Sequence, residues 1–225
     1  TMVAAVTLDS QRMCRLADGG PTSPWTVTAF ESAVVDCRQG LAQVEAERWT
    51  NNRRNERNRG LKRGCTLHAE HDPAAVAAWY PLYLAGTTRW DQAPVPLGFL
   101  QDLLRSAPDQ TVFNCVRLAG ELVAGHFCFV SRDRLVAWQG AVRTELARTH
   151  FLTTLLYWQD LVHACGNDLA AVDFGGCVGR DGLWDFKRRC GAEPEPGWQL
   201  LARSGPGRWL QRLTAGVRAR GGGAA

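Results

Sequence analysis

Long hydrophobic runs are missing from this sequence of 225 residues. It has no stretch of about 18 or more apolar residues, the length that a membrane-spanning helix requires. Its first residues have neither the basic start nor the long apolar core of a signal peptide. We therefore expect no helix that spans a membrane, and we expect a cytoplasmic location.

Signatures of metal and nucleotide sites are also missing. The eight cysteines include no Cys-x-x-Cys pair, and the five histidines do not cluster at the spacing of zinc ligands. Neither a P-loop nor a dinucleotide fingerprint occurs. We predict no metal site, no resident cofactor and mostly reduced core cysteines. A Cys/His nucleophile is a minor alternative, because the local sequence offers no activation partner.

Acidic residues are nearly absent from one segment. Between Arg48 and Gly64, seven residues are Arg or Lys and only Glu56 is acidic, so this segment carries a charge of +6 in a chain whose formal net charge is +4. The positive charge is therefore local. Such a cluster indicates a surface that binds an anion; the alternative is a solvated helix face.

What the chain does contain is enough apolar residues for one sizeable core: 45% are hydrophobic and 21% are charged. The clearest signal is a run of three strands joined by short turns, followed by a long amphipathic helix and another strand. The predicted elements are strand 32–37, helix 41–61, strand 65–69, a helix from residue 73, helix 97–105, strands 111–118, 121–130 and 135–141, helix 144–165, a strand from residue 171 and strand 198–202.

The stretch from Ala171 to Gly191 combines a strand, a turn and a compact helix. Gly175 and Gly176 end the strand, and Gly191 ends the helix. Lys187 lies on this helix. We therefore expect a lysine held close to the end of a buried strand.

Two motifs lie in this stretch: Asp-Phe-Gly-Gly at residues 173–176 and Phe-Lys-Arg-Arg-Cys-Gly at residues 186–191. Together they resemble the late motif of the FemABX-like branch of the GNAT acyltransferases, with Cys190 where an aromatic residue is usual. The resemblance covers about residues 34–202. It implies an α/β (α+β) fold with a GNAT-like mixed, mostly antiparallel sheet flanked by helices.

The resemblance also implies a domain organisation. Family members with cell-wall substrates usually have two GNAT-like halves, and this chain is long enough for one. We predict a remnant of a first half-domain at residues 1–46, a GNAT-like acyltransferase domain at residues 47–215 and a disordered tail at residues 216–225.

By this resemblance, Lys187 and the adjacent Phe186 are catalytic. Amide formation from an activated ester or thioester places negative charge on a carbonyl oxygen, and a positioned cation stabilises it. The alternative is that Lys187 only complements the C-terminal end of its helix. Asp173 either orients the incoming amine or caps the glycine turn by accepting backbone N–H groups, and the cap is favoured.

The donor is predicted from what residues 140–148 lack. Acetyl-CoA users of the superfamily have a glycine-containing pyrophosphate loop here, and this stretch has no such glycine pair. The resemblance then implies an aminoacyl-tRNA, the family's usual donor, as the preferred one, and a phosphopantetheine-bearing thioester, on CoA or a carrier protein, is the alternative. A non-catalytic RNA-binding module is a rival from another class. The predicted phosphate contacts are Arg53, Arg54, Arg57 and Arg59.

The acceptor is expected to be an amine of a peptide or a small molecule. Arg89, at a Thr-x-Arg-like helix exit that resembles the family, and Gln139 are assigned to acceptor binding. The alternative for Arg89 is a helix-terminal arginine that the helix dipole favours. Because one half-domain is largely missing, a peptidoglycan precursor and a substrate of a secondary-metabolite (antibiotic) pathway are both open.

Overall fold

The computed structural model describes residues 3–4, 25–90, 92–177 and 181–202. The chain divides into two units, Ser32–Glu195 and a second unit formed by Thr1–Glu31 with Pro196–Ala225. The predicted tail at residues 216–225 lies outside the described residues, and the predicted boundary after residue 46 remains a prediction.

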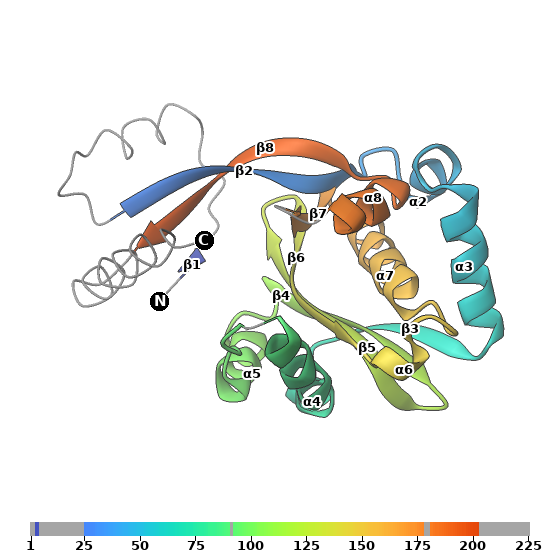
Figure 1. Cartoon of the computed structure of the whole chain (residues 1–225), viewed down its shortest axis with the longest axis horizontal. Helices are drawn as coiled ribbons and strands as arrows, with labels where there is room; N and C mark the ends of the chain where they lie inside the picture. Colours follow the sequence, from blue (N-terminus) through green and yellow to red (C-terminus); the bar gives the residue numbers. More distant parts are fainter. Residues whose placement is uncertain (1–2, 5–24, 91, 178–180, 203–225) are drawn as a thin grey trace, which may run out of the picture. The chain divides into compact units, whose positions relative to one another are not determined.

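The described elements are strands and helices interspersed along the chain (Figure 1). In chain order they are β1 (Val3–Ala4), β2 (Trp25–Asp36), α2 (Leu41–Gln43), the π-helical turn η1 (Val44–Arg48), α3 (Asn51–Lys62), β3 (Cys65–Glu70), α4 (Pro73–Arg89), α5 (Leu97–Ser106), β4 (Thr111–Leu118), β5 (Glu121–Ser131), β6 (Arg134–Val142), α6 (Thr144–Ala147), α7 (Leu152–Gly166), β7 (Ala171–Gly176), α8 (Asp181–Arg189) and β8 (Glu193–Ala202).

The strands with residues in the unit Ser32–Glu195 follow the order β8-β2-β7-β6-β5-β4-β3. The pairs β2/β7, β3/β4, β4/β5 and β5/β6 are antiparallel, whereas β6 and β7 run parallel. The predicted meander forms β4 to β6, and Ala119 and Gly120 make its first turn with φ values of 50° and 82°. The predicted mixed, mostly antiparallel sheet is confirmed.

Helices cover both faces of this sheet, α7 on one and α4 with α5 on the other (Figure 1). Strand residues alternate between the two faces, as the pleat requires. On β4, Phe113 packs with the α4 side chain Trp79, whereas Val116, three residues further on, packs with Leu155 and Leu156 of α7. Each face therefore has its own apolar core.

In the other unit, β8 pairs antiparallel with β1, with Val3 opposite Leu201. The predicted strand 32–37 is the second part of β2, which begins at Trp25. Gly197 lies against the ring of Phe30, where an added Cβ would come within 3.0 Å of the ring. No helix in the described ranges is both long and apolar enough to cross a membrane.

The helix predicted at residues 41–61 is interrupted. Trp49 and Thr50 have ψ angles of 125° and 152°, which are extended rather than helical. The break turns Trp49 into the core, where it is 2% exposed and meets the ring of Trp158 edge-on at 4.8 Å. Burial of this large side chain outweighs the local helical pattern, so the prediction of one continuous helix is wrong.

The helix predicted at residues 144–165 is interrupted too. Phe151 adopts the left-handed conformation, with φ 54° and ψ 38°, and separates α6 from α7. Helix α3 packs against this break, because a Cβ added at Gly60 would come within 2.7 Å of both the His150 carbonyl oxygen and Leu155. The helical spacing of apolar residues continues through the break, so the sequence pattern does not indicate it.

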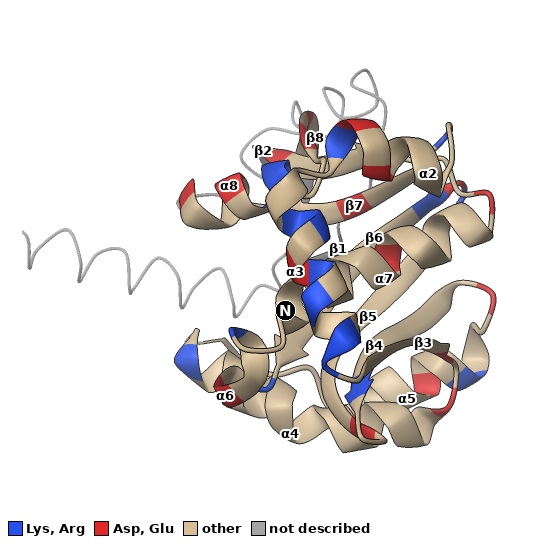
Figure 2. Ribbon diagram, turned by 90° about the vertical axis from the view of Figure 1, so that its right-hand side faces the viewer, with Lys and Arg blue, Asp and Glu red and all other residues tan. Residues whose placement is uncertain are grey.

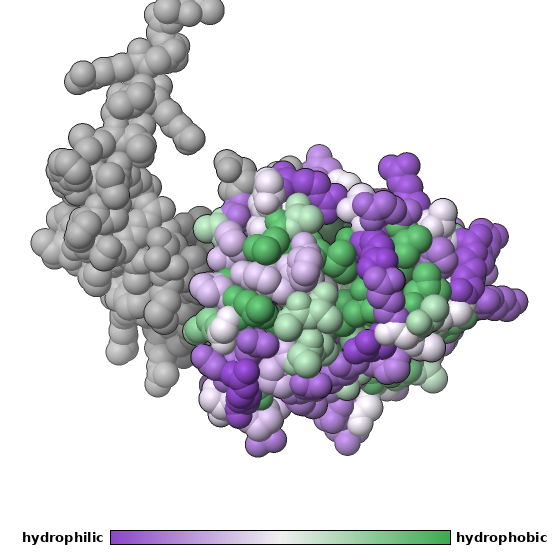
Figure 3. All heavy atoms as spheres, turned by 90° about the horizontal axis from the view of Figure 1, so that it is seen from below, coloured by the Kyte–Doolittle hydropathy of each residue, from purple (hydrophilic) through white to green (hydrophobic). Residues whose placement is uncertain are grey.

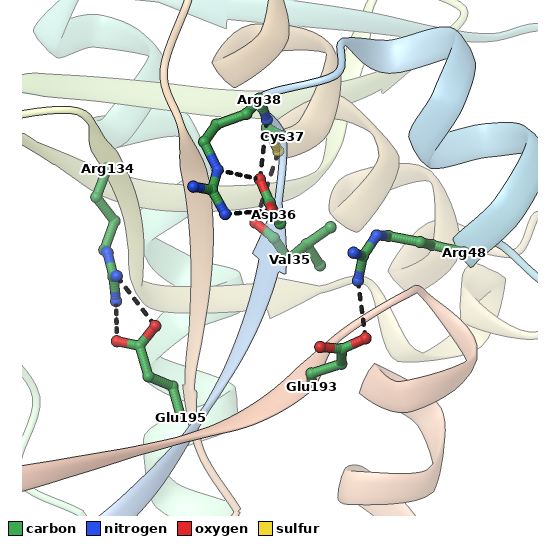
Figure 4. Close-up of polar contacts among 8 residues, drawn as sticks. All are labelled: Val35, Asp36, Cys37, Arg38, Arg48, Arg134, Glu193 and Glu195. Carbon is green, nitrogen blue, oxygen red and sulfur yellow. Dashed lines mark hydrogen bonds and ion pairs between the residues drawn. The ribbon is translucent and has the colours of Figure 1, made fainter.

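Strand β8 starts five residues earlier than the predicted strand 198–202. Two prolines disfavoured this start in the sequence. The structure anchors it with two ion pairs, from Arg48 to Glu193 at 2.9 Å and from Arg134 to Glu195 at 2.7 Å (Figure 4).

The surface over α4 and α5 mixes polar and apolar side chains (Figure 3). Its largest exposed apolar side chains are Leu84, Trp90 and Phe99, which are 37%, 41% and 52% exposed. Polar residues separate the apolar areas in Figure 3. Scattered apolar residues of this kind are ordinary for a protein surface.

We expect Gly60→Ala to lower the free energy of unfolding by about 1–3 kcal/mol, because the added methyl group meets the His150 backbone carbonyl. The matched control is Gly98→Ala in α5, where nothing lies within 4 Å of an added Cβ. That control should leave stability unchanged or raise it by up to about 1 kcal/mol. Urea unfolding measures both, and a Gly60→Ala protein as stable as the wild type would contradict the close packing of α3 on α7.

Candidate active site

The site is built where the parallel strands β6 and β7 separate. Their register runs from Arg134 opposite Ala171 to Val136 opposite Asp173, and no pair beyond this is formed between the two strands in their described residues. β6 continues beside β5, and β7 continues beside β2 as far as Gly176. The facing edges of the two strands therefore offer backbone hydrogen-bonding groups to a ligand.

Lys187 lies at this separation. Its side chain comes from α8 and is 3% exposed. Its Nζ donates to the carbonyl oxygens of Phe174, Gly175 and Gly176 at 2.6, 3.0 and 3.3 Å. The predicted position of this lysine near the end of a strand is confirmed, and its ammonium group stabilises the turn in which Gly175 has a φ of 76°.

The end of helix α8 explains how Lys187 is held. Gly191 has a φ of 91°, and the backbone N–H of Ala192 donates to the Lys187 carbonyl at 3.1 Å. This is the glycine-terminated helix end that the sequence predicts. Cys190, which replaces the usual aromatic, is fully buried in the core under α7.

Phe186 belongs to an aromatic group beside the lysine. Its ring meets Tyr157 at 5.1 Å, and Tyr157 in turn meets Phe174 at 4.4 Å. The guanidinium of Arg53 lies over the Phe186 ring, 4.4 Å from its centre. Burial raises the pKa of Tyr157 well above its usual range, and nearby Cys190 and Asp160 add to this effect. Tyr157 therefore stays protonated.

Asp173 caps the glycine turn. Its Oδ1 accepts the backbone N–H of Gly175 at 2.8 Å and the hydroxyl of Ser32. Its Oδ2 lies 3.8 Å from a guanidinium nitrogen of Arg134. The favoured capping interpretation is confirmed for Gly175, and a role in orienting an amine stays a prediction.

Two of the four arginines predicted to bind phosphate have side chains that contact α7. Arg57 is 8% exposed, donates to Glu45 at 2.6 Å and lies over the ring of Trp158 at 4.2 Å. Arg53 pairs with Glu56 at 2.5 Å and donates to Thr154 at 3.1 Å. These contacts join α3 to η1 and to α7, so the basic segment is partly a structural element.

The other two predicted arginines lie further out. Arg54 is half-buried and donates to the carbonyl oxygens of Glu45 and Ala46 at 2.8 and 3.3 Å. Arg59 is exposed, as are Lys62 and Arg63 at the end of the same helix. Figure 2 shows basic residues along α3 on the side that faces the viewer.

The two residues assigned to the acceptor lie on different elements. Arg89, in the last turn of α4, donates to the Thr144 hydroxyl at 3.0 Å. Gln139 lies on β6 beyond the separation from β7, opposite Phe127 in the register. Because the Phe127 ring packs on the α4/α5 side, this register puts Gln139 on the sheet face opposite α7.

Sequence reasoning missed a buried polar group beneath α7. His126 Nδ1 lies 2.6 Å from Asp160 Oδ2, and the side-chain amide of Asn114 donates to Asp160 Oδ1 at 2.8 Å. Asp160 is fully buried. Its position in an otherwise apolar helical stripe was the available signal, since a buried acid needs partners.

The buried cysteines Cys37, Cys115 and Cys128 are not activated. Burial raises the pKa values of Cys37 and Cys115 to about 12 and raises that of Cys128 well above its usual range, with Asp160 adding to the effect at Cys128. A thiol that keeps its proton is a poor nucleophile, which argues against a Cys128–His126 nucleophile. Within the described ranges, no three His, Cys, Asp or Glu side chains gather into a possible metal site.

The meander, the helix α7 and a parallel strand placed beside the meander form the core of a GNAT-type acyltransferase. The chain belongs to this family: residues 48–188 match the acetyltransferase (GNAT) domain. No curated protein sequence matches the chain significantly.

Solved structures share the fold at low sequence identity. FemX superposes with a TM-score of 0.68 at 12% identity over 92% of this chain and 72% of its own. The C-terminal domain (DUF2156) of a proposed lysylphosphatidylglycerol synthetase from Agrobacterium fabrum superposes with a TM-score of 0.66 at 12% identity. This match covers 92% of this chain and 69% of that domain's chain. L-PGS from Bacillus licheniformis superposes with a TM-score of 0.65 at 14% identity, over 89% of this chain and 68% of its own. The predicted resemblance to the FemABX-like branch is confirmed at the level of family and fold.

Proposed function

We propose that the protein forms amide bonds by moving an aminoacyl or acyl group from an activated donor to an amine. The observation that carries this proposal is the buried ammonium group of Lys187 at the separation of β6 and β7. Amine attack on an ester creates negative charge on the carbonyl oxygen, and a fixed cation in a water-poor site stabilises that charge strongly.

Lys187 can replace one of its hydrogen bonds to backbone carbonyl oxygens with a hydrogen bond to the donor. Its three contacts with carbonyl oxygens range from 2.6 Å at Phe174 to 3.3 Å at Gly176, and the longest is the weakest. A donor carbonyl bound along the edge of β7 would take the place of the Gly176 contact, while the two shorter bonds keep the ammonium group in position. Phe186 then forms an apolar wall beside the reacting carbon.

The packing of α3 supports a donor other than CoA. In acetyl-CoA users the loop after the fourth strand and the following helix start bind pyrophosphate. Here the long helix that follows β6 is α7, and near its start Gly60 of α3 is in close contact with His150 and Leu155. Glu56 also accepts the Thr154 hydroxyl there at 2.7 Å, which places a carboxylate where a pyrophosphate would need cations.

The exposed end of α3 supports an aminoacyl-tRNA donor. Arg59, Lys62 and Arg63 are exposed, and no ion pair holds any of the three within the described part of the chain. Cations of this kind bind the phosphate backbone of a nucleic acid. The donor is a substrate, and we propose no resident cofactor. A charged tRNA also fits the expected cytoplasmic location.

The acceptor in this proposal is an amine of a peptide or small molecule. The acceptor residues Arg89 and Gln139 remain predictions. A peptidoglycan precursor and an amine of an antibiotic pathway are both open as acceptors.

A donor panel tests the function. The protein is incubated with an amine library and with charged tRNAs, acyl-CoAs or carrier-protein thioesters, and the products are identified by mass spectrometry. We expect amide product from charged tRNA and its loss after ribonuclease treatment. Product that forms from acyl-CoA and survives the nuclease would contradict the tRNA donor; absence of any amide product would contradict the proposed reaction.

For Lys187→Met we expect kcat to fall by about 10²- to 10³-fold, the usual effect of removing one group that stabilises a developing oxyanion. The matched control is Arg188→Met on the same helix, because Arg188 is exposed and pairs only with Asp185 among the described residues. Circular dichroism and thermal unfolding establish that both variants are folded at the assay temperature. A folded Lys187→Met protein with wild-type turnover would overturn the assignment.

For the triple variant Arg59→Ala, Lys62→Ala, Arg63→Ala we expect weaker tRNA binding and a plot of log affinity against log salt that is shallower by about 2–3 units. Arg105→Ala on α5 is the control, because Arg105 is exposed but lies on another helix. Binding is measured by fluorescence anisotropy at several salt concentrations. Equal slopes for the triple variant and the wild type would show that this surface does not bind the donor.

A further inference from the structure

A polar row crosses the middle of the sheet beneath α7. The residues Asn114, His126 and Gly140 are register partners on β4, β5 and β6, so they lie side by side. The pleat turns His126 to the face on which α7 packs, where Asp160 meets it. This row ends at Gly140, on the part of β6 that no longer pairs with β7.

Asp160 fixes the orientation of the imidazole. Its two oxygens accept from different partners, Oδ1 from Asn114 at 2.8 Å and Oδ2 from His126 Nδ1 at 2.6 Å. With Nδ1–H donating to the carboxylate, the neutral ring carries its lone pair on Nε2. The assigned tautomer is therefore the one that can accept a proton at Nε2.

The His126 ring packs against Gly140, which has no side chain to displace it. A Cβ at Gly140 would lie 2.3 Å from His126 Cδ2 and 2.5 Å from Nε2, so the edge of the ring rests directly over the glycine. No other residue type leaves room for the ring in this position. His126 is 9% exposed, and in the described part of the chain Nε2 makes no hydrogen bond.

Tyr157 contacts both His126 and the aromatic residues next to Lys187. The His126 ring is 5.3 Å from the Tyr157 ring, which also contacts Phe174 and Phe186. Lys187 donates to the Phe174 carbonyl. Lys187 and the imidazole are thus linked through Phe174 and Tyr157.

We propose that His126 is the base that takes the proton from the attacking amine, with Asp160 and Gly140 as its positioning residues. The inference rests on the proposed amide-forming function. The amine nitrogen bonds to the carbonyl carbon of the donor, the bond from that carbon to the ester oxygen breaks, and the proton lost by nitrogen passes to Nε2. The imidazolium then gives this proton from Nε2 to the departing oxygen, so the reaction consumes and releases none overall.

The charges around His126 favour this role. From α7, Asp160 and Tyr157 face the ring, and His163 interacts electrostatically with Asp160. Cys128 on the same strand lies 3.6 Å from Asp160, and β4 and β6 contribute the neutral Asn114 and Gly140. Tyr157 and Cys128 keep their protons because burial raises their pKa values. The carboxylate of Asp160 is therefore the group that stabilises the imidazolium formed during the reaction.

The test uses His126→Gln in the full chain, with the donor that the panel identifies. We expect kcat to fall by about 10²-fold with little change in the KM of the donor. We also expect the rate to rise with pH in the wild type and this rise to be lost in the variant, and added imidazole to restore part of the activity of His126→Ala. His163→Gln, a partly buried histidine on α7, is the matched control and should keep the wild-type profile.

The outcomes separate the two proposals. A folded His126→Gln protein with wild-type kcat and pH profile overturns the role of His126 and leaves the amide-forming function intact. Loss of activity in step with loss of folded protein, without imidazole rescue of His126→Ala, would mean that His126 only holds α7 to the sheet. A wild-type protein that forms no amide from any donor overturns both proposals.

Discussion

The burial of one ammonium group governs the geometry of the site. A charge that is 3% exposed is tolerated only when hydrogen bonds replace its lost hydration, and Lys187 obtains them from the carbonyl oxygens of three consecutive residues. This requirement fixes the end of β7 and the glycine conformation at Gly175. Asp173 completes the turn from the other side by accepting the Gly175 N–H. The turn, the lysine and the cap form one interdependent unit.

Helix α3 divides its basic residues between two tasks. The arginines nearest its start lie inside the protein: Arg57 stacks on Trp158, and Arg53 connects Glu56, Thr154 and the Phe186 ring. The cations nearest its end face solvent (Figure 2). Cation–π contacts and ion pairs that are largely shielded from water hold the helix on the domain, which leaves the exposed end as a rigid basic surface. A run of charged residues in a sequence does not show which of them are buried, because this depends on how the helix packs on the domain.

Much of the fold could be predicted from sequence, because β4 to β6 are dense in apolar residues and are separated by turn residues, and the glycines around Lys187 mark where its strand and helix end. The helix breaks at Trp49 and Phe151 could not, since each depends on tertiary contacts that override a continuous local pattern. The pairing of His126 with Asp160 was equally hidden. It depends on strand register and on the rotation of α7, and these bring together residues 34 positions apart.

The position of β2 has a consequence for how the protein is made. This strand is synthesised first among those of the unit Ser32–Glu195, yet its partner β7 comes last but one, and the side chains of Ser32 and Asp173 that meet are 141 residues apart. While the ribosome translates the intervening segment, the β2 edge has no β7 to pair with. Contacts of such long range slow folding and expose strand edges in the meantime. Nascent chains of this protein are therefore candidates for chaperone binding until β7 has emerged.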